Sequence, residues 1–135
     1  MADLSITAAN VAVGGIDTQY LFVQFGETVT QGHSVYLKAD GKYWKADADA
    51  LGTAEGRGVV LTPGVGDAYG FIVTGGSLIA GATLTVGTTY VVSTNTGGIA
   101  PIADLVSGDF PCILGTAITT AILEIDISFT GVAKA

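Results

Sequence analysis

The chain has little positive charge and few side chains suited to chemistry. Of its 135 residues only five are Lys or Arg, against twelve Asp and Glu, which gives a formal net charge of −7. Nucleic-acid binding needs clustered basic side chains to neutralise phosphates, so this function class is excluded. The one cysteine, Cys112, rules out an intramolecular disulfide and a metal site built from several cysteines. The single histidine, His33, leaves few ways to assemble a catalytic centre.

Long apolar runs are also lacking. Residues 68–103 carry no charge, but Gly, Thr, Ser or Asn interrupts them every few positions. Such interruptions are typical of short strands and turns rather than of a membrane-spanning helix, so we expect no membrane partner. The start, MADLSITAAN, has neither the basic residues nor the apolar core of a secretory signal.

Glycine, threonine and aliphatic residues are abundant. There are twenty glycines, 49% of the residues are hydrophobic and only 13% are charged. This composition excludes disorder and predicts an all-β fold. We expect a compact barrel or sandwich of short antiparallel strands, with an internal duplication and an extended N-terminal arm. A chain of this length can bury roughly two-thirds of its unfolded surface as one domain.

The duplication is inferred from two glycine-bounded stretches, GETVTQGHSV at 26–35 and GGSLIAGATL at 75–84, which lie 49 positions apart. The matched pairs are Gly26/Gly75, Val29/Leu78, Gly32/Gly81 and Val35/Leu84. Glycine adopts positive φ at little cost, so each stretch is predicted to form a turn at which a strand leaves one sheet for the next. The two copies would span about 26–74 and 75–128.

Strands are predicted from runs of apolar, aromatic and β-branched residues between turn signals. The predicted strands are 3–13, 18–25, 33–39, 42–46, 58–62, 69–74, 88–93, 99–102, 111–119 and 122–129. We expect residues 18–25, TQYLFVQF, to be well buried, and only residues 46–51 to be helical. In the last strand polar and apolar residues alternate, so one face must be wet. The pair Gly14-Gly15 is predicted to detach residues 1–15, as an N-terminal arm, from a single β-domain at 16–135.

Several groups of polar residues have the right types for chemistry, but structural roles are favoured for each. His33 has no orienting partner, and the neighbouring Ser34 would point to the opposite face of a strand. The acidic residues Asp40, Asp47, Asp49 and Glu55 do not follow a calcium-loop pattern. Glu124 and Asp126 could form an acid/base pair only inside a closed cleft. Cys112 is expected to pack as a small apolar residue. We therefore predict no catalytic, cofactor-binding or metal-binding residue, and no enzyme.

The ordered set of motifs resembles the capsid decoration, or cement, and head-fibre proteins of tailed bacteriophages and prophages. The segments that carry the resemblance are MADLSITAANVAVGG, GETVTQGHSVYL, ADGKYWKADADALG, RGVVLTPG and LTVGTTYVVSTNTGGIAPIADLVSGDFPCILGTA. The resemblance implies a non-enzymatic module on the outer capsid surface of the virion, bound to the major capsid protein. It further implies a homo-oligomer, with a trimer favoured, and an arm at Ala2–Val13 that adds to a strand of the coat protein.

The residues expected to make capsid or oligomer contacts are Leu4, Ile6, Val11, Val13, Tyr43 and Trp44. Two other functions stay open at this stage. A tail-fibre or head-fibre adhesion module would use Tyr43, Trp44 and the acidic loop to bind a host glycan. A small hydrolase would use Glu124 and ranks last, since no nucleophile or metal set accompanies it.

Overall fold

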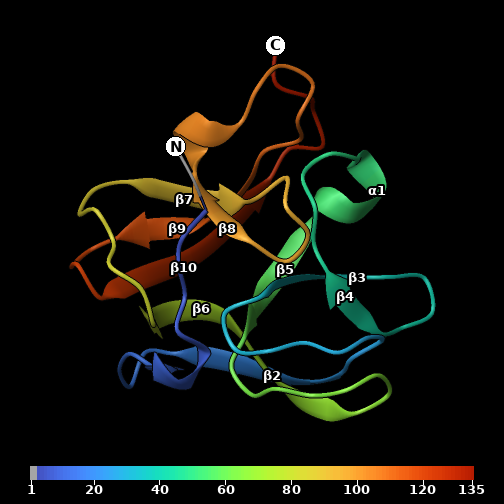
Figure 1. Ribbon diagram of the computed structural model, residues 1–135, viewed down its shortest axis with the longest axis vertical. Helices are drawn as coiled ribbons and strands as arrows, with labels where there is room; N and C mark the ends of the chain where they lie inside the picture. The colour runs from blue at the N-terminus through green and yellow to red at the C-terminus, as the bar shows by residue number, and fades with distance from the viewer. Residues whose placement is uncertain (1–2) are drawn as a thin grey trace.

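The computed structural model describes residues 3–135, and Figure 1 shows a fold made almost entirely of antiparallel strands. This confirms the expected all-β class. The elements are η1 (Ala8–Asn10), β1 (Val11–Val13), β2 (Gln19–Gln24), β3 (Ser34–Leu37), β4 (Tyr43–Lys45), α1 (Leu51–Ala54), β5 (Gly56–Val60), β6 (Tyr69–Ala80), β7 (Thr89–Val92), β8 (Ile99–Pro101), η2 (Ile102–Asp104), β9 (Cys112–Ala117) and β10 (Ile122–Phe129).

The long strand β6 lies at the centre of a curled ten-stranded sheet. Eight of its strands follow the order β4-β3-β5-β6-β10-β9-β7-β8, and β1 and β2 pair with β6 outside this order. The first half of β6 pairs with β5 through Ile72 and Val73, and its second half pairs with β10 through residues 76–79. Along the opposite edge of β6 lie β2, which pairs with Ile72 from the other side, and then β1, which pairs with Leu78. All of these pairings are antiparallel.

The sheet holds two copies of one arrangement. From one end the order is β4-β3-β5-β6, and from the other end it is β8-β7-β9-β10, so strands that correspond in chain order occupy corresponding places. The first half-sheet consists of β2, β3, β4, β5 and residues 69–74 of β6, and the second of residues 76–80 of β6 with β7, β8, β9 and β10. In each copy a hairpin (β3–β4 or β7–β8) is followed by a strand that pairs back with the first strand of that hairpin.

The register also repeats. Strands β3 and β5 are paired at Val35↔Gly58 and then shift by a bulge, and strands β7 and β9 are paired at Tyr90↔Gly115 and shift at the same point. The position after each of these glycines pairs with the next strand, as Val59↔Val73 in one copy and Thr116↔Glu124 in the other. The two halves therefore match residue by residue across the three strands that form the body of each.

This match differs from the glycine alignment drawn from the sequence. Gly26 lies in a bend after β2, whereas Gly75 lies inside β6, so these two residues are not equivalent in the structure. The predicted turn at 75–84 is wrong in its first part, because β6 continues to Ala80. Gly76, with φ of +80°, lies where β6 passes from the first half-sheet to the second, just after the register shift between the pairs Tyr20↔Val73 and Gln19↔Gly75. A positive φ there bends the strand without ending it.

Two hydrophobic cores fill the two halves. The smaller lies inside the first half-sheet, and its buried members are Val23, Phe25, Val29, Val35, Val60 and Ile72. The larger lies under the second half-sheet and also receives Ala46, Ala48, Val59 and Val73 from the first. The two halves share side chains, and the molecule is held together across β5 and β6.

Two local expectations are wrong. The stretch 18–25 is not well buried: β2 is an edge strand whose first four residues are exposed, since no second neighbour covers it within the described residues. Residues 46–50 are not helical, and the expected helix begins only at Leu51, as α1. Ala46 and Ala48 are fully buried in the loop and turn before it, because their small side chains fit the core.

Most other strand predictions are confirmed. The hairpin around Asp40-Gly41 forms between β3 and β4, and the closing pair forms as β9 and β10. In β10 Leu123 and Ile125 are buried while Asp126 is exposed, as the alternation predicts. Over residues 3–135 no helix has the length and apolar character needed to cross a bilayer.

Candidate functional site

Residues 3–13, here called the N-terminal segment, cross the open side of the second half-sheet. Figure 1 shows the segment in blue, descending past β8 and β10 toward the level of β6. The Leu4 N–H donates to the Ile99 carbonyl of β8 at 2.8 Å, and the Thr7 N–H donates to the Gly81 carbonyl beyond β6 at 2.8 Å. Val11–Val13 then pair with Leu78–Ala80 as β1. The expectation that Gly14-Gly15 detaches this segment is therefore wrong for the isolated chain.

The first half-sheet closes without any such insertion. After β2, the Gly26 N–H donates directly to the Tyr43 carbonyl of β4 at 2.9 Å, and Phe25 and Tyr43 form a parallel bridge. The corresponding gap in the second half-sheet, between β8 and the end of β6, is spanned by the N-terminal segment. The segment thus bridges the gap that would otherwise separate β8 from the end of β6, although only its last part, β1, is a regular strand.

The predicted contact residues of the segment differ in how deeply they are buried. Val11 is only 7% exposed and belongs to the larger core, while Val13 is 43% exposed. Leu4 and Ile6 are half-buried and pack against the edge of the same core. Ile6 also lies against Gly32, where a Cβ would approach its side chain to 2.6 Å. Gly32 adopts φ of +92°, so both backbone conformation and space favour glycine there.

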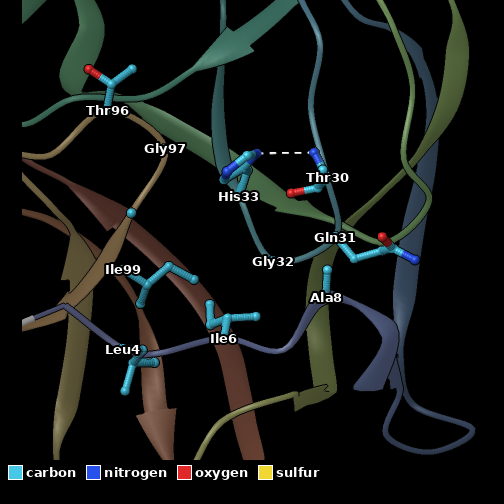
Figure 2. Close-up of a pocket in the computed structure, with 11 residues that line it drawn as sticks. Leu4, Ile6, Ala8, Thr30, Gln31, Gly32, His33, Thr96, Gly97 and Ile99 are labelled. Atoms are coloured by element: carbon cyan, nitrogen blue, oxygen red, sulfur yellow. Dashed lines mark hydrogen bonds between the residues drawn. The ribbon is translucent and has the colours of Figure 1, made fainter.

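Hollows lie on both sides of the segment. One, of about 230 Å³, is lined by Leu4, Ile6 and Ala8 on one wall, with residues 30–33 and 96–99 forming the rest. Figure 2 shows Leu4 and Ile6 on the opposite side of this hollow from His33. The other, of about 390 Å³, is lined by Ser5, Thr7 and Asn10 together with residues around Gly81. Residues 4–10 therefore border open space on two sides.

The end of the segment is anchored by one carboxylate. The Asp3 side chain accepts hydrogen bonds from Ser93 Oγ at 2.6 Å and from Asn95 Nδ2 at 3.3 Å, both in the turn that joins β7 to β8. This contact is polar and partly exposed to water, and water can replace it when the carboxylate leaves.

His33 borders the first hollow but is held as a structural residue. Its Nδ1 accepts a hydrogen bond from the Thr30 N–H at 3.1 Å, which stabilises the turn before β3. Burial, followed by the nearby Lys45 ammonium, lowers the pKa of His33 below its usual value, against an opposing effect of Glu27. Ser34 is buried, and its hydroxyl donates to the Gly98 carbonyl at 3.0 Å, so it does not engage His33.

Trp44 and Tyr43 lie side by side in the sequence of β4 and do not line either hollow. The Trp44 ring packs against the Gly26 backbone, where a Cβ would overlap it. The Lys38 ammonium lies 4.2 Å from the ring centroid, and Nε1 donates to Asp40 at 3.2 Å. Tyr43 packs against the smaller core. Both aromatic residues are half-buried and already engaged within the fold.

The four acidic residues of the predicted loop do not converge. Asp40 caps the β3–β4 turn by accepting the Lys42 N–H at 2.9 Å, and Glu55 pairs with Arg57 at 3.5 Å. Asp47 accepts hydrogen bonds from the Asp49 N–H and from the Thr96 hydroxyl, so it ties the loop before α1 to the β7–β8 turn. Across the described part of the chain, no three His, Cys, Asp or Glu side chains gather as a group that could hold a metal ion.

The other two candidates have structural partners as well. Glu124 accepts a hydrogen bond from Ser77 Oγ at 3.3 Å, and the same hydroxyl lies 3.0 Å from Asp17, which ties the loop after β1 to β6. Cys112 is fully buried, and burial raises the pKa of its thiol to about 11. A thiol with this pKa is almost entirely protonated at neutral pH and is a poor nucleophile there.

The sequence did not point to an exposed aromatic cluster on β2 and β6. Phe22 stacks on Tyr69 with ring centroids 5.5 Å apart and contacts Phe71 at 5.1 Å, and Tyr20 meets Phe71 edge-on at 5.5 Å. Tyr20 and Phe22 are 58% and 59% exposed. Their spacing of two within TQYLFVQF was the available signal, since it places both rings on one face of a strand.

Comparisons with known proteins assign no function to the surfaces described above. No protein-family model matches the chain, and no curated protein matches it significantly.

Proposed function

We propose that the chain is a non-enzymatic decoration protein of a tailed-phage head, which binds the outer surface of the assembled shell through its N-terminal segment and stabilises it. The observation that supports this proposal is how few contacts hold residues 3–10 to the rest of the fold. These residues run between β8 and the end of β6 in the second half-sheet without forming a regular strand. Only the Leu4 and Thr7 N–H groups make backbone bonds across this gap, and hollows flank the residues.

A segment held in this way can be exchanged for other contacts. Leaving the fold would break two backbone hydrogen bonds and the Asp3 contacts, each worth about 1 kcal/mol net in water. Pairing with an exposed strand of the major capsid protein would replace these bonds and add new ones by strand addition. Residues 3–10 precede β1, so they can move while Val11 keeps its place in the core.

Stabilisation of the shell then follows from mass action. A protein that binds only the assembled shell shifts the equilibrium toward that shell, by an amount that grows with its concentration above Kd. Repetition over the particle makes many modest contacts act together. The compact β-body, uncharged along β2 and acidic overall, supplies rigidity and solubility rather than chemistry.

The test is co-sedimentation with empty heads assembled from the major capsid protein that the same genome encodes. Full-length protein should pellet with heads, and a variant lacking residues 2–9 should stay in the supernatant. This truncation keeps β1 and Val11, so circular dichroism should show an unchanged fold. Full-length protein that fails to bind would remove the proposed function, while a truncated variant that binds normally would remove the N-terminal segment from it.

The adhesion alternative can be tested separately. A glycan array probed with the wild-type chain and Trp44→Ala would detect it, since loss of a glycan signal with the variant would place binding at Trp44. We expect no signal, because the ring already packs on Gly26 and Lys38 and offers little free surface for a sugar to stack on.

A further inference from the structure

We infer that the free edge of β2 is a self-association surface, at which two copies of the chain pair antiparallel through their β2 strands around a twofold axis. Within residues 3–135, β2 has a neighbour on one side only, which is β6. The Phe25 N–H and carbonyl both bond to the loop before β6, at Ala68 and Asp67. Because backbone groups alternate along a strand, those of Phe22 and Tyr20 face the opposite, open edge.

The internal repeat shows which kind of strand pairs with an edge of this type. Leu21 pairs with Ile72 in the first half-sheet, and Leu78 pairs with Leu123 at the same place in the second. Leu21–Val23 are therefore the counterparts of Leu78–Ala80. In the second half-sheet that edge is covered by β1, an antiparallel, uncharged strand of aliphatic residues. In the first half-sheet no strand of the described residues pairs with the same edge.

The composition of β2 points to a second copy as the occupant. From Thr18 to Phe25 the chain has no charged residue and no proline, although the molecule carries −7 overall. Strand edges without charge, proline or cover readily pair with other chains. Two such edges approach each other without placing like charges face to face, and a twofold contact uses both at once. Strand β1 of a neighbour is a poorer occupant, since it is already paired with β6 and its Val11 is buried in its own core.

The expected register is centred on Leu21. Its backbone faces β6, so two Leu21 residues form a close, non-hydrogen-bonded pair, and each Tyr20 lies opposite the partner's Phe22. This places the exposed rings of the two copies in one continuous aromatic surface. It also covers Leu21, which is 47% exposed although the neighbouring Val23 on the same face is buried. Such a contact closes at two copies, so it favours a dimer over the trimer that the resemblance implies.

The first measurement is molar mass in solution by sedimentation velocity, with no phage component present. Wild-type protein should have twice the 13.5 kDa of the chain, and added salt should strengthen the dimer by screening the repulsion between two acidic copies. Phe22→Lys should give a monomer. The control Val106→Lys places the same charge on a similarly exposed apolar residue in a distant turn and should stay dimeric. If Phe22→Lys unfolds, Leu21→Lys provides the same test with the aromatic cluster intact.

The second measurement fixes the register. Under mild oxidation Leu21→Cys should form a disulfide-linked dimer, because residues in a close antiparallel pair lie within disulfide reach. Leu51→Cys, similarly exposed on α1, should remain monomeric on a denaturing gel, and the buried Cys112 should not react in either protein. A monomeric or trimeric wild type, or a Phe22→Lys or Leu21→Lys variant that still dimerises, would overturn the inference. Equal cross-linking of both cysteine variants would overturn the register.

Discussion

Gly58 and Gly115 occupy the same position in the two halves of the molecule. Each pairs with the strand before it at the residue preceding a bulge, and each lies against a backbone carbonyl of the strand that follows, that of Val73 or of Glu124. At Gly58 an added Cβ would lie 2.7 Å from the Val73 oxygen, and at Gly115 it would overlap the Glu124 oxygen. The close approach of three strands therefore depends on glycine at both places.

Substitution of these glycines should destabilise the protein. We expect Gly115→Ala to lower the free energy of unfolding by roughly 1–3 kcal/mol, since the backbone must shift to admit a methyl group. Gly52→Ala is the matched control, because a Cβ there meets no atom within 4 Å and the residue lies in α1. It should be neutral or stabilise by about 0.5–1 kcal/mol. Urea unfolding measures both, and equal effects would contradict the proposed packing.

The two valines of β1 should differ sharply in their contribution to stability. Val11→Ala should cost roughly 1–3 kcal/mol, because Val11 is buried in the larger core. Val13→Ala makes the same chemical change on an exposed side chain and should cost less than about 0.5 kcal/mol. Thermal unfolding distinguishes the two. Equal losses would mean that β1 is not seated as described, and that the whole N-terminal segment can leave the fold.

Cys112 should make stability depend on alkaline pH. Its thiol pKa rises from 9.0 to about 11 on folding, so the unfolded chain loses its proton first. Stability is then constant below the unfolded pKa and falls as pH rises from 9 toward 11, by about 2 kcal/mol. Urea unfolding from about pH 8 to pH 11 measures this. Cys112→Ala should lack this component, and an identical pH profile in the variant would assign the fall to other groups.

His33 should have a pKa below its usual 6.5, because it is partly buried and close to Lys45. The unfolded chain then takes up a proton before the folded one, so this part of the stability is present above pH 6.5 and is lost as pH falls from there toward the folded pKa. As the only histidine, it can be titrated directly by NMR. Lys45→Met should raise the value, whereas Lys42→Met, at a cation that does not act on His33, should leave it unchanged.

The sequence by itself determined the fold class and most strand positions. Some features depend only on residues that are close together in the sequence, so they can be predicted from it. Examples are the turn signal Asp40-Gly41 and the alternation of Leu123 and Ile125 with Glu124 and Asp126. The sequence also indicated that Ser34 points away from His33. These features depend on local backbone geometry, which sequence spacing encodes directly.

Only the tertiary structure decided which residues of the two halves correspond, because register and bulges are set by long-range pairing. Gly75 matched Gly26 by spacing but lies inside β6, and the true partners Gly58 and Gly115 stand in dissimilar sequences. Likewise TQYLFVQF had the composition of a buried strand, and it lies at an edge because no strand among residues 3–135 covers its outer side. Burial of a strand depends on which neighbours reach it, and no residue of β2 carries that information.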